Sequence, residues 1–381
     1  MKKTTLALLA SAFVANSASA ITVFENQDTG TKVEFTGSAR LQWRSEANKT
    51  SNVNGTTTRK HENKAVSNNG SRFGFKVNQQ LGAGFYALGR VEWRFQDHNL
   101  ARSQHDFDHV YDRQLYAGIG HKQYGELTYG HMTTVTDEVK QTDLPNTLSL
   151  SDGLLTANAR HAIQYTYQGI DGLKLGAFYS GHSQRGSNGL DLTNHVKDVW
   201  GVAAIYKHKI DELQSVKTGI GFTRDRFEQS GLSAYDRNAF SFGAAYTYDK
   251  TTIGVDLERR ETNDQRVVEN AGKANEVNRG ALGNKRTEKE IRAVLFHKIT
   301  DDWRAYTMYA YKDNKLDSVV AGKDTKVRRH QFMLGTEYYI VPKYLKTFVE
   351  WQTTHAKHFE NGEKTKRVRD NITVIGARAY W

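Results

Sequence analysis

The sequence predicts an all-β protein, a 16-stranded antiparallel transmembrane β-barrel with short periplasmic turns and long extracellular loops. Three features predict it: a period-two alternation of apolar and polar residues, connections that are short and long in turn, and an N-terminal export signal. The composition alone suggests a soluble protein, because only 38% of the 381 residues are hydrophobic and 25% are charged. After the N-terminus, no stretch approaches the roughly 18 apolar residues that a membrane-spanning helix needs.

Residues 1–20 have the pattern of a secretory signal peptide. Lys2 and Lys3 precede a short apolar stretch from Leu6 to Ala15, and Ala18-Ser19-Ala20 supplies small residues for cleavage. Cleavage would leave residues 21–381 as the barrel domain and would lower the formal net charge from +11 to +9. The chain contains no cysteine, which excludes disulfides and cysteine-ligated metal sites.

The mature chain alternates with the period of a strand. In the first segment Phe35, Leu41 and Trp43 share one face, and Arg40 and Arg44 lie on the other. Each segment has about the 9–11 residues that a tilted membrane strand needs. The sixteen predicted strands are 33–45, 71–80, 84–96, 113–120, 123–131, 160–168, 172–181, 198–208, 215–225, 239–248, 251–260, 288–299, 302–312, 329–340, 344–355 and 371–381.

Seven short turns alternate strictly with eight long polar connections, so all the long loops emerge at one end of the sheet. The two prolines, Pro145 and Pro342, both lie outside the predicted strands. The long connections are 46–70, 97–112, 132–159, 182–197, 226–238, 261–287, 313–328 and 356–370. A sheet in lipid must close, because hydrocarbon offers no partner to a free backbone group.

The C-terminus ends on an aromatic residue, and Ile375, Ala377, Ala379 and Trp381 share one face. This resembles the last strand of Gram-negative outer-membrane proteins, whose final aromatic is read by the barrel-assembly machinery. The resemblance implies that Trp381 is an assembly signal and that the protein resides in the cell outer membrane.

Three internal motifs resemble those of the Gram-negative general diffusion porins, most closely the Pasteurellaceae type. They are Ser71-Arg72-Phe73-Gly74-Phe75-Lys76, the hairpin within 113–131 and the strand start Ala159-Arg160-His161-Ala162-Ile163-Gln164-Tyr165. The resemblance implies a homotrimer whose water-filled channels let small hydrophilic solutes and ions diffuse passively, filtered by size and charge. It implies no cofactor, no metal and no catalysis.

In this family the third loop, here 132–159, folds into the barrel and faces arginines on the opposite wall. Its acids are Asp137, Glu138, Asp143 and Asp152. Motif match assigns Arg72, Arg113 and Arg160 to the basic wall, and strand alternation adds Arg40, Arg90 and Arg94. Opposed charges of this kind would set a transverse field across the lumen.

Further basic clusters fall in predicted loops, at Arg59-Lys60, Lys285-Arg286, 326–330 and 364–369. Nucleic-acid binding is one interpretation of a basic chain. An exported barrel does not meet nucleic acid, and contact with the phosphates of lipopolysaccharide in the outer-membrane lipid is the better interpretation. The His/Asp-rich stretch from Asp97 to His109 matches no defined metal-site spacing.

Three alternatives to a general porin stay open. An outer-membrane enzyme would have fewer strands and a nucleophile–base pair, and the chain has no Gly-x-Ser-x-Gly. A substrate-selective channel would line its lumen with aromatic residues, for which Tyr86 and Tyr116 are candidates. A role of the long loops as an adhesin or antibody target is compatible with a porin.

Overall fold

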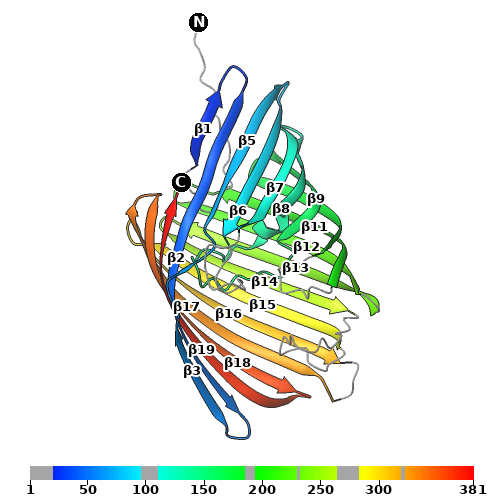
Figure 1. The fold of residues 1–381 in the computed structure, drawn as a ribbon, viewed down its shortest axis with the longest axis vertical. Helices are drawn as coiled ribbons and strands as arrows, with labels where there is room; N and C mark the ends of the chain where they lie inside the picture. Colours follow the sequence, from blue (N-terminus) through cyan, green and yellow to red (C-terminus); the bar gives the residue numbers. More distant parts are fainter. Residues whose placement is uncertain (1–19, 96–109, 185–193, 230–231, 264–282, 319–321) are drawn as a thin grey trace.

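The computed structural model describes residues 20–95, 110–184, 194–229, 232–263, 283–318 and 322–381. Sixteen of its strands form a closed antiparallel barrel, as the sequence predicts (Figure 1). They are β2 (Thr31–Asn52), β5 (Arg72–Gly82), β6 (Phe85–Phe95), β7 (Val110–His121), β8 (Gly125–Thr133), β9 (Asn158–Ile170), β10 (Leu173–Gln184), β11 (Asn194–Lys209), β12 (Gln214–Gln229), β13 (Leu232–Tyr248), β14 (Thr251–Asn263), β15 (Gly283–Lys298), β16 (Trp303–Ser318), β17 (Thr325–Val341), β18 (Leu345–Glu360) and β19 (Glu363–Tyr380).

Three shorter strands extend the sheet next to β2. They are β1 (Ile21–Asn26), β3 (Thr57–Asn63) and β4 (Ser67–Asn68). A five-residue 3-10 helix, η1 (Val135–Val139), lies between β8 and β9. Among the described residues there is no helix with the length and hydropathy that crossing a membrane requires.

The barrel closes where the last strand pairs with the first. β19 runs antiparallel to β2 from Tyr380↔Ser38 to Lys366↔Asn52. The last residue continues this seam, since Gly37 N donates to Trp381 O at 2.9 Å and Trp381 N donates to Gly37 O at 3.2 Å. Beyond the point where β19 ends, β1 pairs with the same edge of β2, from Ile21↔Phe35 to Asn26↔Thr31. Closure satisfies the backbone groups that an open edge would leave free.

All sixteen predicted segments are strands, but many run further into the extracellular side than predicted. The first covers 31–52 instead of 33–45, and the last begins at residue 363 instead of 371. Much of the predicted loops 313–328 and 356–370 is therefore strand, and the β18–β19 turn is only Asn361-Gly362, both at positive φ. The alternation of apolar and polar residues marks only the part of a strand that contains apolar residues. The pairing of the two strands of a hairpin continues beyond it, in water, between polar residues.

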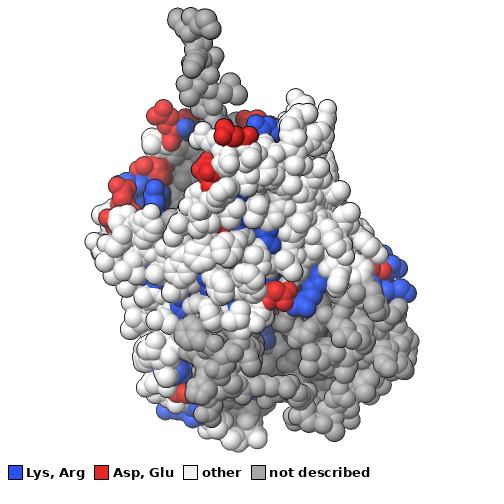
Figure 2. Space-filling model, turned by 45° about the horizontal axis from the view of Figure 1, so that its top comes forward, with Lys and Arg blue, Asp and Glu red and all other residues white. Residues whose placement is uncertain are grey.

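The two faces of the barrel differ in polarity. Outward positions carry large apolar side chains that are exposed in the isolated chain, among them Leu115, Ile119, Val349 and Ile375. Inward positions carry polar and charged residues, such as Gln42, Glu92 and Glu350, that are buried inside the barrel. In Figure 2 broad areas of the surface are uncharged, and the charged residues lie in separate patches between them. The low apolar content thus follows from strands that need only one apolar face.

We expect Gly37→Val to weaken the seam. A Cβ at this position would lie 2.4 Å from the indole nitrogen of Trp381 and 2.7 Å from the carbonyl oxygen of Arg72. Overpacking of this kind costs about 1–3 kcal/mol. The measurement is the fraction of refolded barrel that migrates as the compact species on an unheated gel. Gly89→Val is the matched control, because its nearest neighbouring atom is 3.8 Å away. Equal folding of both variants would show that the contact with Trp381 is unimportant.

Candidate constriction site in the lumen

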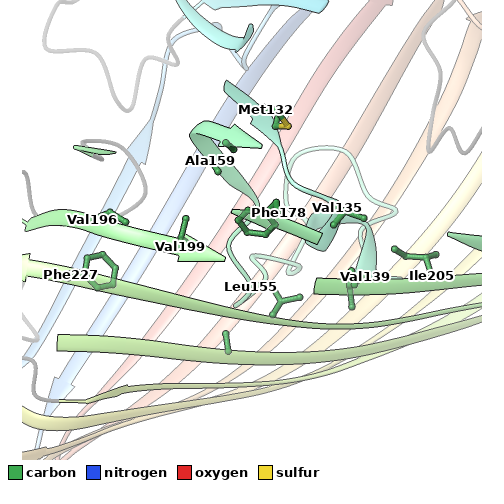
Figure 3. Packing of buried hydrophobic residues seen from close by; sticks show 13 residues of the cluster. Met132, Val135, Val139, Leu155, Ala159, Phe178, Val196, Val199, Ile205 and Phe227 are labelled. Atoms are coloured by element: carbon green, nitrogen blue, oxygen red, sulfur yellow. The ribbon is translucent and has the colours of Figure 1, made fainter. Parts of the chain in front are cut away.

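The connection between β8 and β9, residues 134–157, folds against the inner wall of the barrel and is called loop 3 below. Val135, Val139 and Leu155 of loop 3 are buried in one cluster with Phe178 of β10 and Ile205 of β11. Figure 3 shows these side chains between the loop and the wall. The loop therefore narrows the channel as a packed element.

Glycines on the inner wall let the loop backbone approach the strands. A Cβ at Gly219 or Gly243 would lie 2.6 or 2.5 Å from the carbonyl oxygen of Val139, and one at Gly254 would lie 2.7 Å from that of Gln141. These glycines lie on the adjacent strands β12, β13 and β14 and leave room for the loop backbone along the wall. The sequence contained a signal for it, namely glycine at inward positions of neighbouring strands, which the sequence analysis missed.

Buried wall carboxylates hold the loop through its backbone. Glu350 accepts hydrogen bonds from the N–H groups of Asn146, Thr147 and Leu148, at 2.8, 2.9 and 2.7 Å. Its side chain is fully buried. Hydrogen bonds to a charged acceptor are among the stronger ones in proteins. Glu350 is therefore the main attachment of the loop at its far end.

A second set of carboxylates holds the nearer part of the loop. Asp256 accepts from the N–H groups of Gln141 and Thr142 at 2.8 and 3.2 Å. Glu258 accepts from Leu154 N at 2.9 Å. These wall residues lie more than 100 positions from their loop partners in the sequence, so no local sequence pattern predicts the contacts.

Arg292 neutralises much of the acidic wall behind the loop. This fully buried guanidinium lies 3.3 Å from Asp256, 2.9 Å from Glu258 and 2.6 Å from Glu290. Lys312 lies 3.6 Å from Glu290 and also pairs with Asp152 of the loop. Buried carboxylates need such partners, because removing an unpaired charge from water is costly.

The four predicted loop acids do not share one environment. Asp137 pairs with Lys140 of the loop at 3.1 Å, and Glu138 pairs with Lys174 of β10 at 2.5 Å. Asp152 pairs with Lys312, as described above. Asp143 is exposed and accepts a hydrogen bond from Ser149 at 2.7 Å. In the described part of the chain, Asp143 is the loop-3 acid that has no ion pair.

Arginines crowd the inner wall of the strands that loop 3 leaves uncovered. Cross-strand pairing places Arg40 opposite Arg378, and Arg72 opposite Arg94. Glu92 lies among them, 2.8 Å from Arg90 and 3.5 Å from both Arg72 and Arg94. Sequence reasoning missed both Glu92 and Arg378, although each occupies an inward position of its strand.

Arg113 belongs to the same side of the lumen and reaches the root of the loop, where it donates to the side chain of Asn158. At the opposite end Arg378 donates to the carbonyl oxygen of Asn146 at 2.7 Å. Loop 3 thus runs along the inside of β10 to β18 and meets the basic side at both ends. The arginines described above lie on β19, β2, β5, β6 and β7, which complete the ring of strands.

Arg160 does not join this wall. Along β9 the pairing passes from Gly130↔Ala162 to Met132↔Ala159, so two residues, Arg160 and His161, lie opposite one residue of β8. His161 has a φ of 50°, as expected at such a bulge. Arg160 is exposed and lies near Asp112 and His131, which pair at 2.8 Å. The sequence prediction assigned Arg160 to the wall by motif match, and a motif match does not reveal the extra residue at this bulge.

The described residues contain no group of three or more His, Asp or Glu side chains placed to hold a metal ion. The His/Asp-rich stretch 97–109 lies outside the described residues, as does nearly all of the predicted signal peptide. Tyr86 donates to Glu126 at 2.7 Å, and Tyr116 lines a cavity of about 190 Å³ beside Lys32, Lys76 and Arg90.

A closed membrane barrel with a loop folded into its lumen defines a channel of the outer membrane and not an enzyme. Residues 4–317 match the family model described as Gram-negative porin, and the chain belongs to this family. It forms an outer-membrane channel for diffusion.

The chain is 28% identical over its whole length to a major outer membrane protein of Pasteurella multocida, which it also covers completely. Among solved structures it resembles an anion-selective porin from Comamonas acidovorans, with a TM-score of 0.63 and 14% identity over 92% of this chain and 100% of that one. It also resembles the trimer form of Vibrio cholerae OmpT, with a TM-score of 0.60 and 18% identity over 92% and 99% of the two chains.

We expect Glu350→Gln to loosen the far end of loop 3. The glutamine amide keeps one acceptor oxygen and replaces the other with an NH2 group, which cannot accept from the backbone N–H groups of the loop. We expect this to weaken the attachment of the loop by a free energy on the order of 3 kcal/mol. Single-channel recordings should then show a noisier open level with altered conductance. Glu360→Gln removes the same charge from an exposed position at the β18–β19 turn and should leave the recordings unchanged. If the recordings of the Glu350→Gln variant were as free of noise as those of the wild type, with the same conductance, this role of the carboxylate would be contradicted.

Proposed function

We propose that this porin filters small hydrophilic solutes and ions at the level of loop 3, by size and by charge. The observation that supports this is the cluster of Arg40, Arg72, Arg94 and Arg378 on the inner wall of β2, β5, β6 and β19, which loop 3 contacts only at its ends. The exposed acids of loop 3, foremost Asp143, would lie opposite this cluster. Fixed charges of opposite sign on two sides of a narrow pore create a transverse field that orients dipolar solutes and selects ions.

The balance of charges at this level favours anions. Among the described residues, Glu92 is the one carboxylate within 4 Å of the arginine cluster. Three of the four loop acids are already paired with lysines. The basic wall therefore presents more uncompensated charge to the lumen than the loop does, and the channel should conduct anions at least as well as cations.

A substrate-selective channel is the second candidate, and the cavity beside Tyr116 favours it. Lys32, Lys76 and Arg90 line this cavity, which lies on the periplasmic side of the arginine cluster, with Lys76 directly opposite Arg90. An anionic solute could occupy the cavity before it reaches the cluster. Saturable block of conductance by one class of anion would support this candidate, and conductance that rises in proportion to anion concentration would exclude it.

Export, assembly and partners complete the proposal. Residues 1–20 would be removed on export, and Trp381 would be the residue that the barrel-assembly machinery reads. The likeness to a solved trimer supports a homotrimer. Lipopolysaccharide would contact the outer-facing basic residues.

We expect the double variant Arg72→Gln, Arg94→Gln to shift selectivity toward cations. Two unit charges about 4 Å apart in water interact by about 1 kcal/mol, which corresponds to a roughly fivefold change in relative permeability. The measurement is the reversal potential in a planar bilayer under asymmetric salt. Arg160→Gln is the control, because this residue lies away from the cluster, and it should leave the potential unchanged. The proposed filter would be wrong if the double variant and Arg160→Gln gave the same potential.

A further inference from the structure

Three lysines gather on the inner wall of the barrel, on the periplasmic side of loop 3. Lys174 lies on β10, Lys207 on β11 and Lys217 on β12, and these strands are adjacent. Cross-strand pairing places Lys207 directly opposite Lys217. Lys207 faces the lumen, because Ile205, two residues away on the same strand, is buried against the loop. We call the three lysines the lysine group.

The lysine group begins where the contact between loop 3 and the wall ends. A Cβ at Gly176 of β10 would lie 2.6 Å from Val135 Cγ2, and one at Gly219 of β12 would lie 2.6 Å from the carbonyl oxygen of Val139. Both valines belong to η1, which Figure 3 shows against these strands. The next inward residue toward the periplasm on each strand belongs to the lysine group. The group therefore lies about 7 Å along the wall from η1.

The lysine group carries more positive charge than its surroundings neutralise. Glu138 of η1 pairs with Lys174 at 2.5 Å. Among the described residues, no carboxylate lies within 4 Å of Lys207 or Lys217. Asp256 of β14 attracts Lys217, but it is already engaged in the ion pairs behind the loop. Like charges directly opposite each other on neighbouring strands are destabilising. An anion between the two unpaired lysines would remove this repulsion.

The spacing of the unpaired lysines suits a tetrahedral oxyanion. Residues directly opposite on neighbouring antiparallel strands have Cβ atoms about 4.5–5.5 Å apart. Two long side chains from such positions can donate to different oxygens of one phosphate, and lysine binds phosphate as a point charge. A multiply charged anion is favoured over chloride, because the Coulomb energy grows with the product of the charges. Lys and Arg side chains around a pore select anions in the same way.

We propose that the lysine group binds a multiply charged oxyanion, the phosphate of inorganic phosphate or of a phosphate ester. Lys207 and Lys217 would hold the phosphate, and Lys174 would join them when the anion displaces the carboxylate of Glu138. A bound oxyanion would hinder the passage of other anions beside loop 3. This inference rests on the channel assigned above and is independent of the arginine cluster, which lies on other strands.

The test uses the purified mature protein in a planar bilayer, with inorganic pyrophosphate as the probe. The measurement is the pyrophosphate concentration that halves the single-channel conductance in potassium chloride. Lys207→Gln, Lys217→Gln removes the unpaired lysines. One ammonium about 4 Å from a unit charge in water changes affinity about fivefold, so the half-blocking concentration should rise about 25-fold.

Lys122→Gln, Lys250→Gln is the matched control. It also removes two lysines, both exposed at the periplasmic turns β7–β8 and β13–β14. Both double variants should migrate as compact, folded barrels on an unheated gel, and the control should be blocked at the wild-type concentration. Equal half-blocking concentrations in the two double variants would overturn the proposal.

A single substitution should change the block in the opposite direction. Glu138→Gln removes the carboxylate that pairs with Lys174 and leaves this ammonium available to the anion. Pyrophosphate should then block at an about fivefold lower concentration. Damage to the fold would not produce tighter block, so the gain is specific. Unchanged or weaker block in this variant would overturn the three-lysine site.

The variant Arg72→Gln, Arg94→Gln separates the lysine group from the charge filter. Pyrophosphate should still block this variant, although its reversal potential shifts. Block that is lost with the arginines and retained without the unpaired lysines would place the anion at the arginine cluster and overturn the proposal. Intact block with an unchanged reversal potential would contradict the charge filter and would support the lysine group independently of it.

Discussion

Closure of the sheet by the β19–β2 ladder is the constraint on which the rest of the structure depends. A backbone N–H or C=O group left free in hydrocarbon costs several kcal/mol, so an open sheet cannot remain in the membrane. The ladder extends from Lys366↔Asn52 to Tyr380↔Ser38, and Trp381 continues it by pairing with Gly37. The ring of strands is thereby fixed in register, and every paired inward position acquires a defined neighbour on the adjacent strand.

The fixed ring explains how a loop whose only regular structure among the described residues is one short 3-10 helix can be held inside a wet channel. Loop 3 contributes backbone N–H groups, and the wall contributes buried carboxylates from β14 and β18 that accept them. Such carboxylates would be unfavourable alone, but Arg292 pairs with Asp256 and Glu258. The track of inward glycines then lets the loop lie against strand backbone. The loop is therefore held by its hydrogen bonds to the wall carboxylates and by its packing against the wall, and many of its residues are buried.

Sequence alone predicted the barrel because closure in lipid enforces strict alternation, which is visible locally in every strand. It predicted strand ends less well: at β18 and β19 pairing continues to the two-residue turn at Asn361-Gly362, where no apolar residue marks the strand. Arg40, Arg72, Arg90 and Arg94 were placed inward by the same alternation. Arg160 was assigned to the wall by motif match instead, and it lies elsewhere because the β9 bulge inserts one extra residue at this point of the strand. The link from Glu350 to loop 3 spans 202 to 204 positions and arises only when the barrel closes.

The same alternation divides the basic residues of β19 between two environments. Lys366 and Arg378 occupy one parity, facing the interior, whereas Arg367 and Arg369 occupy the other, facing outward. A slip of one residue in the register of β19 would exchange the two sets, because successive side chains of a strand point to opposite faces. Arg378 would then point outward, toward hydrocarbon. Ile375, which now points outward, would point into the lumen. The β19–β2 pairing that satisfies the backbone therefore also determines which positive charges line the water-filled channel and which lie at the outer surface. A shift in register would exchange the two sets of residues and would also break the pairing that closes the barrel.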